Sequence, residues 1–485
     1  MPEINKIHVL FAGAEAEPLV KVGGLGDVAG ALPKAITDAA SDQIEIRMIL
    51  PFHAVIKQKN PPMGLIGPFP IQTSAGISSC DLYVSKLNSL TLYLLDNDNI
   101  NHNSPIYYED SDLNGRKYAF FSLALLEAMK YIGWRVDILH ANDWHTALSI
   151  YALKTIYKDD PFYTGTKTVL SIHNLPYNGY GSQLAMTDLG FIPSMDPDLP
   201  DWARLTPLPL GIATADKIIA VSPEYAREIL TPDFGCGLED YLNLHKNRIS
   251  GILNGIDTEV WDPATDQFIN HNFTINKPEK KLQNKLELQK EYGLEINPDI
   301  PLLTVVSRLD YQKGIGIIFD GLEKILKKSW QLALLGTGAS DLEDRAKDLA
   351  QQYPKKIVSI VKYDNAISHK LYASGDIFLM PSLFEPCGLS QMIAMRYGNI
   401  PVARATGGLK DSIIDFRSNP ENATGFLFID KTPESFVRAV NSAFQQYANK
   451  SIWNQIQQNA MTTDFSWSHS AKKYLRVYQQ LVENQ

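Results

Sequence analysis

Two loops in the second half of the chain carry charges of opposite sign directly after apolar runs. Arg308 and Lys313 follow the run Leu302–Ser307, and Glu385 follows the run Asp376–Met380. Two cations beside the start of a helix suit a diphosphate. A carboxylate that is the only charge in an apolar stretch suits sugar hydroxyls or a developing positive centre. The alternatives are solvated surface charges for the cations and helix capping for Glu385.

Glycine-rich loops follow two other apolar runs. The first, Lys21–Asp27, comes directly after Ile7–Ala12 and contains Gly23 and Gly24. Glycines there let the backbone come close to a phosphate or a sugar, and the helix that follows presents its amino end to an anion. The spacing differs from that of the G-x-G-x-x-G dinucleotide fingerprint. A tight strand-to-helix turn is the alternative for this loop and for the second one, Thr406–Leu409.

Polar residues also cluster where two apolar runs of the first half end. The segment His140–His145 contains Asp143, and the segment Ser171–Asn174 contains His173. Ligands of open α/β sheets bind outside the carboxyl ends of strands, so both segments are candidates for one cleft. The alternatives are a helix N-cap by Asn142 or Asp143 and a structural role for the histidine.

Apolar runs that do not alternate with polar residues predict the scaffold. Such runs are typical of strands buried on both faces of a parallel sheet, and the helical patterns between them predict doubly wound α/β units. A polar stretch at 262–300 separates two series, so we expect two units of similar size with a changeover near 250–262. The predicted strands are Ile7–Ala12, Ile44–Leu50, Leu90–Leu95, Val136–His140, Thr168–Ile172, Lys217–Val221, Leu302–Ser307, Gln331–Leu335, Val358–Val361, Asp376–Met380, Pro401–Ala403 and Gly425–Ile429. The predicted helices include Tyr118–Met129, Thr146–Tyr157, Asp341–Gln352, Ser390–Tyr397 and the tail Ser466–Leu481.

Composition excludes several classes of protein. The 485 residues suffice for two to four domains. Lys and Arg number 45 against 54 Asp and Glu, and the formal charge of −9 argues against a general nucleic-acid coat. The cysteines, Cys80, Cys236 and Cys387, exclude a disulfide framework and fit a reducing cytosol. No apolar run reaches the roughly 18 residues of a membrane span, and no signal peptide is visible, so we expect a cytoplasmic protein.

Metal motifs are weak in this sequence. The D-x-D matches Asp96-Asn-Asp98 and Asp196-Pro-Asp198 are short enough to occur by chance, and C-x-x-C, H-E-x-x-H, G-x-S-x-G and Walker patterns do not occur. We therefore expect no metal and no other cofactor.

Taken together and in order, these motifs resemble the bacterial glycogen synthase and plant starch synthase family. The most specific are Phe-Glu-Pro-Cys-Gly-Leu at 384–389 and Ser-Arg-Leu followed by Gln-Lys-Gly at 307–314. The resemblance implies an α/β fold of GT-B architecture, with two Rossmann-like doubly wound domains facing across a deep interdomain cleft. It implies an acceptor-side domain at 1–255, completed by a carboxy-terminal helix at 464–485, and a nucleotide-sugar donor domain at 256–463. The matching stretches are Lys21–Asp27, His140–His145, His173–Tyr177, Val221–Ile229, Thr231–Glu239, Gly251–Asp262, Val306–Gly314, Phe384–Gln391, Thr406–Asp411 and Asp464–Trp467.

The family's reaction is the transfer of glucose from a nucleoside-diphosphate glucose to the non-reducing 4-hydroxyl of an α-1,4-glucan, with retention of configuration. The resemblance implies this reaction for the present chain, with glycogen as acceptor, ADP-glucose as the favoured donor and a bacterial cytoplasmic setting. The alternatives are the same reaction with UDP-glucose preferred, and another retaining GT-B glycosyltransferase.

The resemblance also assigns roles to residues. Arg308 and Lys313 would hold the diphosphate, Glu385 would lie near the glucose, and Asp143 would lie on the acceptor side of the reacting carbon. His173 would bind the sugar. Cations for the departing diphosphate and carboxylates for a positively charged sugar centre would favour the transition state over the substrate. The residues implied to contact the donor are Lys21, Gly23, Gly24, Asp27, Tyr108, Asn254, Tyr363, Cys387, Gly388, Leu389, Thr406 and Gly407, with Tyr363 stacked on the base.

Three segments depart from the family pattern. Leu383 stands where an arginine usually precedes Phe-Glu-Pro-Cys, and Leu208–Ile212, with Pro209, lacks a usual lysine. The family's Asp-Asn-x-x-Arg-Phe segment appears here as Leu113-Asn-Gly-Arg-Lys-Tyr118. These departures affect positions that the resemblance associates with binding of the donor and the acceptor. The residues predicted to hold the diphosphate and the sugar match the family.

Three other classes of protein compete with this interpretation. A nicotinamide oxidoreductase would require the G-x-G-x-x-G spacing after a strand, which the first glycine loop lacks. A two-carboxylate glycosidase would release free sugar and would not need the two cations. A glucan-binding module would keep its affinity in the variant Glu385→Ala and would not turn over nucleotide sugar.

Overall fold

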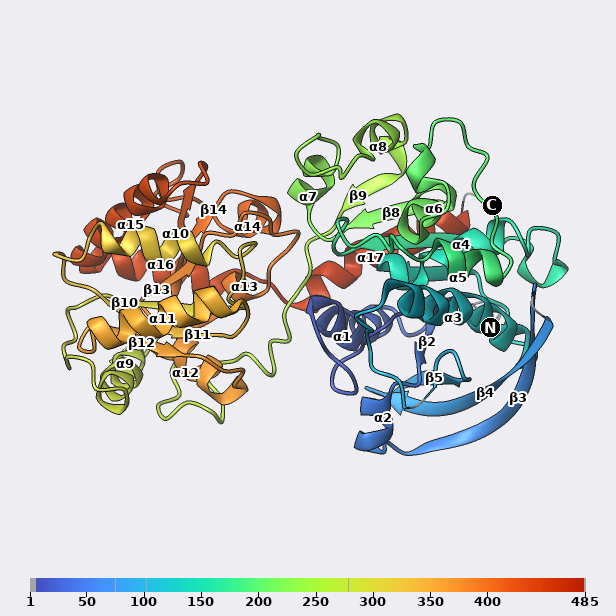
Figure 1. Cartoon of the computed structure of the whole chain (residues 1–485). Helices are drawn as coiled ribbons and strands as arrows, with labels where there is room; N and C mark the ends of the chain where they lie inside the picture. Colours follow the sequence, from blue (N-terminus) through green and yellow to red (C-terminus); the bar gives the residue numbers. More distant parts are fainter. Residues whose placement is uncertain (1–5, 75, 102, 278, 484–485) are drawn as a thin grey trace. The chain divides into compact units, whose positions relative to one another are not determined.

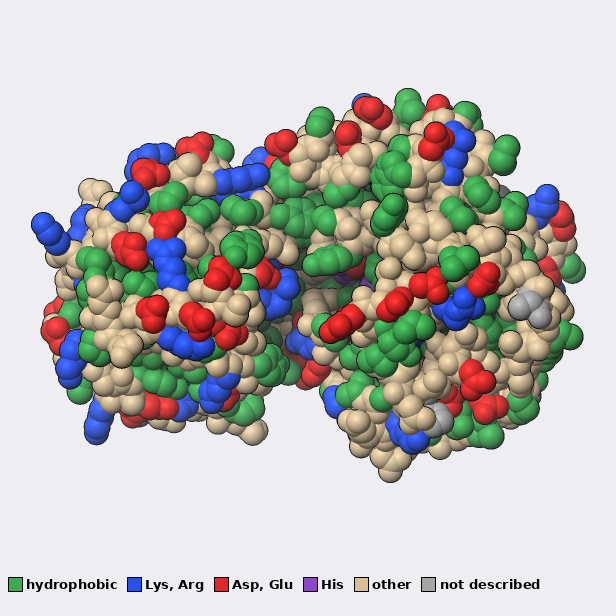
Figure 2. Space-filling view, viewed as in Figure 1, with side chains coloured by type: hydrophobic (Ala, Val, Ile, Leu, Met, Phe, Trp, Pro, Cys, Tyr) green, Lys and Arg blue, Asp and Glu red, His purple; other side chains and the backbone are tan. Residues whose placement is uncertain are grey.

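The computed structural model describes residues 6–74, 76–101, 103–277 and 279–483 (Figure 1). The chain divides into two compact units. Unit 1 comprises Met1–Gly255 and Trp467–Gln485, and unit 2 comprises Ile256–Ser466. No helix in the described part of the chain is long and apolar enough to cross a membrane. Basic and acidic side chains are interspersed over the face of each unit that Figure 2 shows.

Unit 1 is built on a sheet whose strand order is β3-β4-β5-β2-β1-β6-β7-β8-β9. From β5 across the sheet to β9, every pair of neighbouring strands is parallel, as predicted. At the other side of the sheet, β4 runs antiparallel to both β3 and β5. The strands are β1 (Ile7–Ala12), β2 (Ile44–Pro51), β3 (Met63–Thr73), β4 (Gly76–Leu87), β5 (Leu90–Asp96), β6 (Ile138–Asn142), β7 (Lys167–Ile172), β8 (Lys217–Ala220) and β9 (Ile249–Gly251). The helices are α1 (Gly24–Ala39), α2 (Ala54–Lys59), α3 (Ser111–Tyr131), α4 (Asp143–Lys154), α5 (Gln183–Asp188), α6 (Pro207–Thr214), α7 (Pro223–Glu228), α8 (Glu239–Leu244) and α17 (Trp467–Glu483).

The β3–β4 hairpin corrects the expectation of a purely parallel sheet. Pro68 and Pro70 lie within β3, and a register shift falls between Leu65 and Gly67. Proline cannot donate to a strand ladder, so it is tolerated only where one side of the strand has no partner. β3 is the last strand of the sheet on that side, which is where such a sequence can form a strand.

The core of unit 1 requires the last helix of the chain. Trp467, Tyr474 and Tyr478 of α17 are buried in one apolar cluster with residues of β1 and α1. The Tyr478 hydroxyl lies 2.6 Å from Nδ1 of His140, which is itself fully buried. The tail therefore belongs to unit 1, although unit 2 intervenes in the sequence.

Unit 2 is built on a second sheet, in which every strand pair is parallel and the order is β12-β11-β10-β13-β14-β15. The strands are β10 (Leu302–Val306), β11 (Gln331–Leu335), β12 (Ile357–Ile360), β13 (Ile377–Met380), β14 (Ile400–Arg404) and β15 (Phe426–Phe428). The helices are α9 (Glu279–Glu291), α10 (Ile315–Glu323), α11 (Ser340–Gln352), α12 (Asn365–Ser374), α13 (Ser390–Arg396), α14 (Gly407–Ser412), α15 (Pro433–Ala448) and α16 (Lys450–Thr462).

Each sheet has a point between two central parallel strands at which the strand order reverses. In unit 1 the chain moves from β1 to β2 on one side and later from β6 outward on the other, so the reversal falls between β1 and β6. In unit 2 the reversal falls between β10 and β13. The loops that leave neighbouring strands at such a point diverge and open a crevice, which is where ligands of doubly wound sheets bind.

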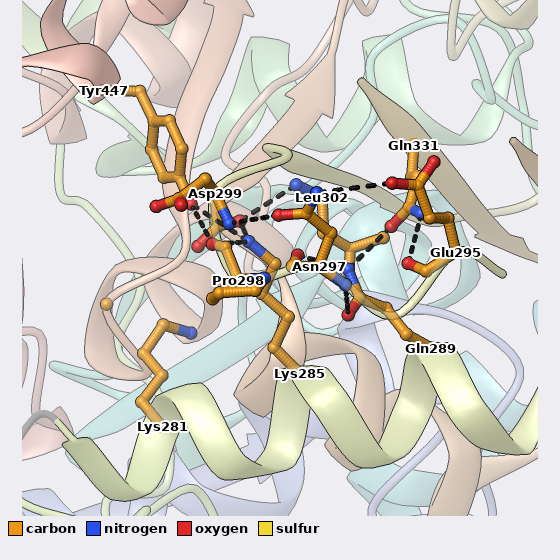
Figure 3. Close-up of polar contacts among 12 residues, drawn as sticks. Lys281, Lys285, Gln289, Glu295, Asn297, Pro298, Asp299, Leu302, Gln331 and Tyr447 are labelled. Carbon is orange, nitrogen blue, oxygen red and sulfur yellow. Dashed lines mark hydrogen bonds and ion pairs between the residues drawn. The ribbon is translucent and has the colours of Figure 1, made fainter. Parts of the chain in front are cut away.

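Helix α9 lies in the polar stretch of the sequence. No apolar periodicity was visible there because most of the side chains that this helix buries are polar (Figure 3). Lys285 Nζ forms an ion pair of 2.7 Å with Asp376 Oδ2 and donates to the carbonyl of Pro298 and the hydroxyl of Tyr447, each at 2.9 Å. The side chain of Gln289 donates to the carbonyl of Asn297 at 3.0 Å. Hydrogen bonds attach this helix to unit 2 together with one apolar side chain, Leu288, which packs in a core cluster with Leu302 and Leu335.

Replacing Lys285 with Met should lower the free energy of unfolding by about 3–5 kcal/mol, because Asp376 would remain buried without its cation. Urea unfolding of the whole chain measures the change. Lys290→Met, an exposed lysine on the same helix, is the matched control and should change stability by no more than about 0.5 kcal/mol. Adding Asp376→Asn to Lys285→Met should recover part of the lost stability. A Lys285→Met variant as stable as the wild type would contradict a stabilising role for this buried ion pair.

Candidate active site

The crevice at the reversal point of unit 2 holds the predicted cation and carboxylate side by side. Lys313, in the loop between β10 and α10, places its Nζ 2.6 Å from Oε2 of Glu385, in the loop between β13 and α13. Ser382 donates its hydroxyl to the same oxygen at 2.9 Å. The two charged side chains are 18% and 7% exposed, so neither is a solvated surface charge. Glu385 does not cap a helix, which removes that alternative.

A small pocket opens beside this pair. Its volume is about 130 Å³, and it combines an apolar floor from β10 and β13 with polar groups from the two loops. An ammonium group has three N–H donors, and Lys313 uses one on Glu385, so the others remain for an anion in the pocket. The lining residues are Val305, Val306, Ser307, Arg308, Lys313, Ile315, Phe378, Leu379, Met380, Ser382 and Ser390.

Backbone contacts fix the loop that carries Glu385. The carbonyl of Gln312 accepts from the amide of Leu383 at 2.7 Å, which joins the Lys313 loop to the Glu385 loop. Arg404 of β14, which the sequence analysis did not single out, is 5% exposed and donates through Nε to the carbonyl of Ser382 at 2.7 Å. Its guanidinium also donates to the carbonyl of Leu383. The main chain at 383 is therefore held by Arg404, whatever side chain stands there.

The second glycine loop packs against the Glu385 loop. A Cβ on Gly407 would lie 2.0 Å from the carbonyl oxygen of Glu385, and a Cβ on Gly408 would lie 2.1 Å from that of Cys387. The amide of Gly408 donates to the Glu385 carbonyl at 3.1 Å, and Thr406 is fully buried. Close packing between two loops thus accounts for these glycines, and contact of this loop with a donor stays a prediction.

The remaining predicted residues of unit 2 have different surroundings. The Arg308 guanidinium pairs with Asp310 at 2.9 Å and is 61% exposed, so it borders the pocket from the solvent side. Gly388 has a φ of +71°, and a Cβ there would lie 2.5 Å from the side chain of Gln391. Tyr363 follows β12, two strands from β10, and is 81% exposed. No described contact joins Tyr363 to the pocket.

The crevice at the reversal point of unit 1 holds Asp143. Its Oδ1 accepts from the amides of His173 at 2.7 Å and Asn174 at 3.3 Å, so the carboxylate joins the ends of β6 and β7 instead of capping its own helix. The N-cap alternative for Asp143 is therefore wrong. Burial raises the pKa of Asp143 to about 7, although the two amides oppose the shift. Its φ of +54°, unusual for a side chain other than glycine, is a strained conformation of the kind found at functional sites.

His173 is held as a neutral donor beside Asp143. Its Nε2 lies 3.0 Å from Oδ1 of Asn142, an oxygen that only accepts, so the proton is on Nε2. Asn142 in turn donates to the carbonyl of Ala12, at the end of β1, at 2.9 Å. Burial lowers the pKa of His173 to about 4. The imidazole therefore remains uncharged near neutral pH and offers Nδ1 as an acceptor.

The first glycine loop differs from the second in being open. A Cβ on Gly23 or Gly24 would have no atom within 4 Å, so packing within the described residues does not require these glycines. Glu15, which the sequence analysis missed, is 3% exposed and accepts from the amides of Val22 at 2.5 Å and Gly23 at 3.0 Å. Its other oxygen accepts from the hydroxyl of Tyr107. The signal in the sequence was a carboxylate three residues past a buried strand, followed by a second one at Glu17.

Other predicted residues of unit 1 are spread along its sheet. Lys21 and Asp27 pair with each other at 2.6 Å across the glycine loop. Tyr108 follows Tyr107, and its amide donates to the side chain of Asn114 at 2.8 Å. Asn254 follows β9 at the far edge of the sheet and is 5% exposed, with a buried Oδ1 that has no described partner. His140 is a core residue bonded to Tyr478 and Ser171. Among the residues placed in the structure, no cluster of three His, Cys, Asp or Glu could hold a metal ion.

Comparison with known proteins connects both crevices to one family. Residues 8–244 match the starch synthase catalytic domain, and residues 289–460 match glycosyl transferases group 1. The chain is 40% identical to the glycogen synthase of Clostridium perfringens over 100% of both chains, and 38% identical to that of Streptococcus pneumoniae strain Hungary19A-6 over 98% of this chain and 100% of the other.

Among solved structures, the catalytic domain of starch synthase IV from Arabidopsis thaliana, bound to ADP and acarbose, has a TM-score of 0.88 and 30% identity over 99% of this chain and 100% of that one. A sucrose-phosphate synthase from Thermosynechococcus elongatus, at 18% identity and a TM-score of 0.62 over 99% of this chain and 100% of that one, shares the fold. These matches confirm the resemblance seen in the motifs and the GT-B class of the two Rossmann-like units. The chain belongs to the family of bacterial glycogen synthases and plant starch synthases, and it is a glycosyltransferase.

Proposed function

We propose that this enzyme transfers glucose from ADP-glucose to the non-reducing 4-hydroxyl of an α-1,4-glucan such as glycogen, with retention of configuration. The observation that carries the proposal is the buried pair of Lys313 and Glu385 at the reversal point of unit 2, in a chain 40% identical to a glycogen synthase over its whole length. The related starch synthase IV was solved with ADP, which favours adenine over uracil as the donor base.

The chemistry of unit 2 suits the donor. Lys313 can hold Glu385 through one N–H and a phosphate oxygen through another, and Arg308 adds a second cation at the pocket rim. Charge that builds on the departing diphosphate is then stabilised more than the charge of the bound substrate, which is what lowers a barrier. Glu385, fixed by Lys313 and Ser382, supplies negative charge for an oxocarbenium-like sugar.

The chemistry of unit 1 suits sugar and acceptor. The neutral His173 and the buried Asp143 offer a hydrogen-bond acceptor and a carboxyl group for hydroxyls of the glucose and the incoming glucan end. The open loop at Gly23 and Gly24 leaves room for the donor to approach the backbone. We propose that both sets of residues act in one turnover.

We also propose that the enzyme acts in the bacterial cytoplasm. The named glycogen synthases come from bacteria, and Cys80, Cys236 and Cys387 are thiols rather than halves of disulfides, as a reducing compartment allows.

A side-by-side rate measurement tests the proposal. Purified protein should release ADP when ADP-glucose and glycogen are both present, and neither compound alone should give nucleotide. The rate with UDP-glucose should be lower. The new linkage should be α-1,4, as judged by proton NMR of the extended glucan. Folded protein that releases no nucleotide from either donor would contradict the reaction, whereas a faster rate with UDP-glucose would contradict only the choice of base.

A further inference from the structure

Lys117 of α3 is a buried lysine that the proposed chemistry does not use. Its side chain is fully buried, and its Nζ lies 2.9 Å from Nδ1 of His53, 3.2 Å from Oγ of Ser104 and 3.3 Å from the carbonyl oxygen of Ile106. It also donates to the carbonyl of Pro105. No carboxylate lies within ion-pair distance of it among the residues that the structure describes. Neutral oxygens and one nitrogen therefore hold this amine.

The histidine partner is fixed in one protonation form. His53 Nε2 lies 2.8 Å from the carbonyl oxygen of Ala14, which only accepts, so Nε2 donates and Nδ1 accepts from Lys117. Burial and the charge of Lys117 lower the pKa of His53 to about 3, which keeps the ring neutral. Lys117 is thus linked through His53 to the residue that directly precedes Glu15.

A second route leads from Lys117 to the same place. The segment Ser104–Ile106, which Lys117 holds by three hydrogen bonds, continues into Tyr107. The Tyr107 hydroxyl donates to Glu15, and Glu15 accepts from the amides of Val22 and Gly23 in the open glycine loop. Both routes therefore end at the carboxylate that shapes this loop.

We propose that Lys117 is a positioning residue that holds the first glycine loop through His53, Tyr107 and Glu15, and that its ammonium form is the one that keeps this loop in place for the donor. The inference rests on the proposed function in one respect, that this loop contacts the donor.

Charge on Lys117 is sensitive to pH because burial lowers its pKa from 10.5 to about 7. The ionisable groups around it are His53 after β2, His145 on α4, Glu15 after β1 and the tyrosines 107, 108 and 118. Burial lowers the pKa of His145 well below its usual value and raises those of Tyr107 and Tyr118 well above theirs, so these groups do not titrate near pH 7. Below about pH 7 the ammonium has three N–H donors for its four acceptors, and above it the amine has two.

The experiment compares KM for ADP-glucose and kcat of the full chain from pH 6 to pH 9, with glycogen as acceptor. The wild-type KM should rise about fivefold as the pH passes through 7, as expected for one lost hydrogen bond. Lys117→Arg should keep the low KM across the range, and Lys117→Met should show a high KM at every pH with a smaller change in kcat. Lys130→Met, a partly exposed lysine on the same helix, is the matched control and should behave like the wild type.

A second readout does not depend on turnover. Hydrogen exchange followed by mass spectrometry should show faster exchange at 20–27 and 104–108 in Lys117→Met than in Lys130→Met. A wild-type KM that does not change with pH, or a Lys117→Arg profile that follows the wild type, would overturn the inference even if Lys117→Met fails to fold. Absence of turnover in the wild type would instead contradict the proposed function, and the exchange data would still decide the positioning role.

Discussion

Lys313→Ala and Glu385→Ala should each lower kcat by about 100-fold or more, as the loss of a partner for transition-state charge typically does. The pair is 2.6 Å apart and nearly buried, so each change also leaves the opposite charge without its partner. Steady-state rates with ADP-glucose and glycogen measure the effect. Lys324→Ala, an exposed lysine of unit 2 that pairs with Glu434, is the control and should retain the wild-type rate.

The double variant Lys313→Ala/Glu385→Ala tests whether the two residues act together as one unit or independently of each other. If the two side chains act as one unit, the combined loss should be well below the product of the single losses, because residues in direct contact are not additive. Ser382→Ala, which removes only one hydrogen bond to Glu385, should cost about tenfold. Near-normal turnover in either single alanine variant would show that the replaced residue does not stabilise charge in the transition state.

Alanine at Gly408 should lower stability, whereas alanine at Gly24 should not. At Gly408 the new Cβ would lie 2.1 Å from the Cys387 oxygen and 2.5 Å from the Cys387 Cα, both backbone atoms of the loop that carries Glu385. Overpacking of this kind costs about 1–3 kcal/mol, and here it displaces the carboxylate as well. Gly408→Ala should therefore lower both the unfolding midpoint and the rate, the latter by about 100-fold.

Gly24→Ala should reduce activity without a loss of stability. Gly24 is the first residue of α1, and a Cβ there would have no atom within 4 Å. Alanine in a helix is favoured over glycine by about 0.5–1 kcal/mol, so the unfolding midpoint should stay the same or rise. If the open space serves the donor, KM for ADP-glucose should rise about tenfold or more. Calorimetry and kinetics on both variants measure the contrast, and an unchanged KM in Gly24→Ala would mean that the loop is only a turn.

The parallel strands could be predicted because their chemistry is local to the sequence. A strand covered by helices on both faces reads as an unbroken apolar run, and the runs Ile7–Ala12 and Gln331–Leu335 form β1 and β11 with the predicted bounds. The hairpin of β3 and β4 was missed because prolines usually interrupt strands and are tolerated here only at a sheet edge. Helix α9 was missed because Lys285 and Gln289 bury polar groups whose partners lie elsewhere in the chain.

The site was predictable to the extent that its side chains directly follow central strands. Asp143 and the Lys313 loop come immediately after β6 and β10, and strand order alone brings such loops to a crevice. Glu15, Arg404 and Lys117 were missed for one physical reason. Each bonds to at least two main-chain amides or carbonyls, and those partners are brought close only by the fold.

The place of α17 in unit 1 has a consequence for synthesis on the ribosome. Unit 2 is continuous in sequence, so the whole of it has been translated before α17 emerges. The core of unit 1 lacks Trp467, Tyr474 and Tyr478 until then, and its apolar surface stays exposed on the nascent chain. We expect the later-made unit to reach its native packing first, with the earlier one depending on chaperones until α17 has been made.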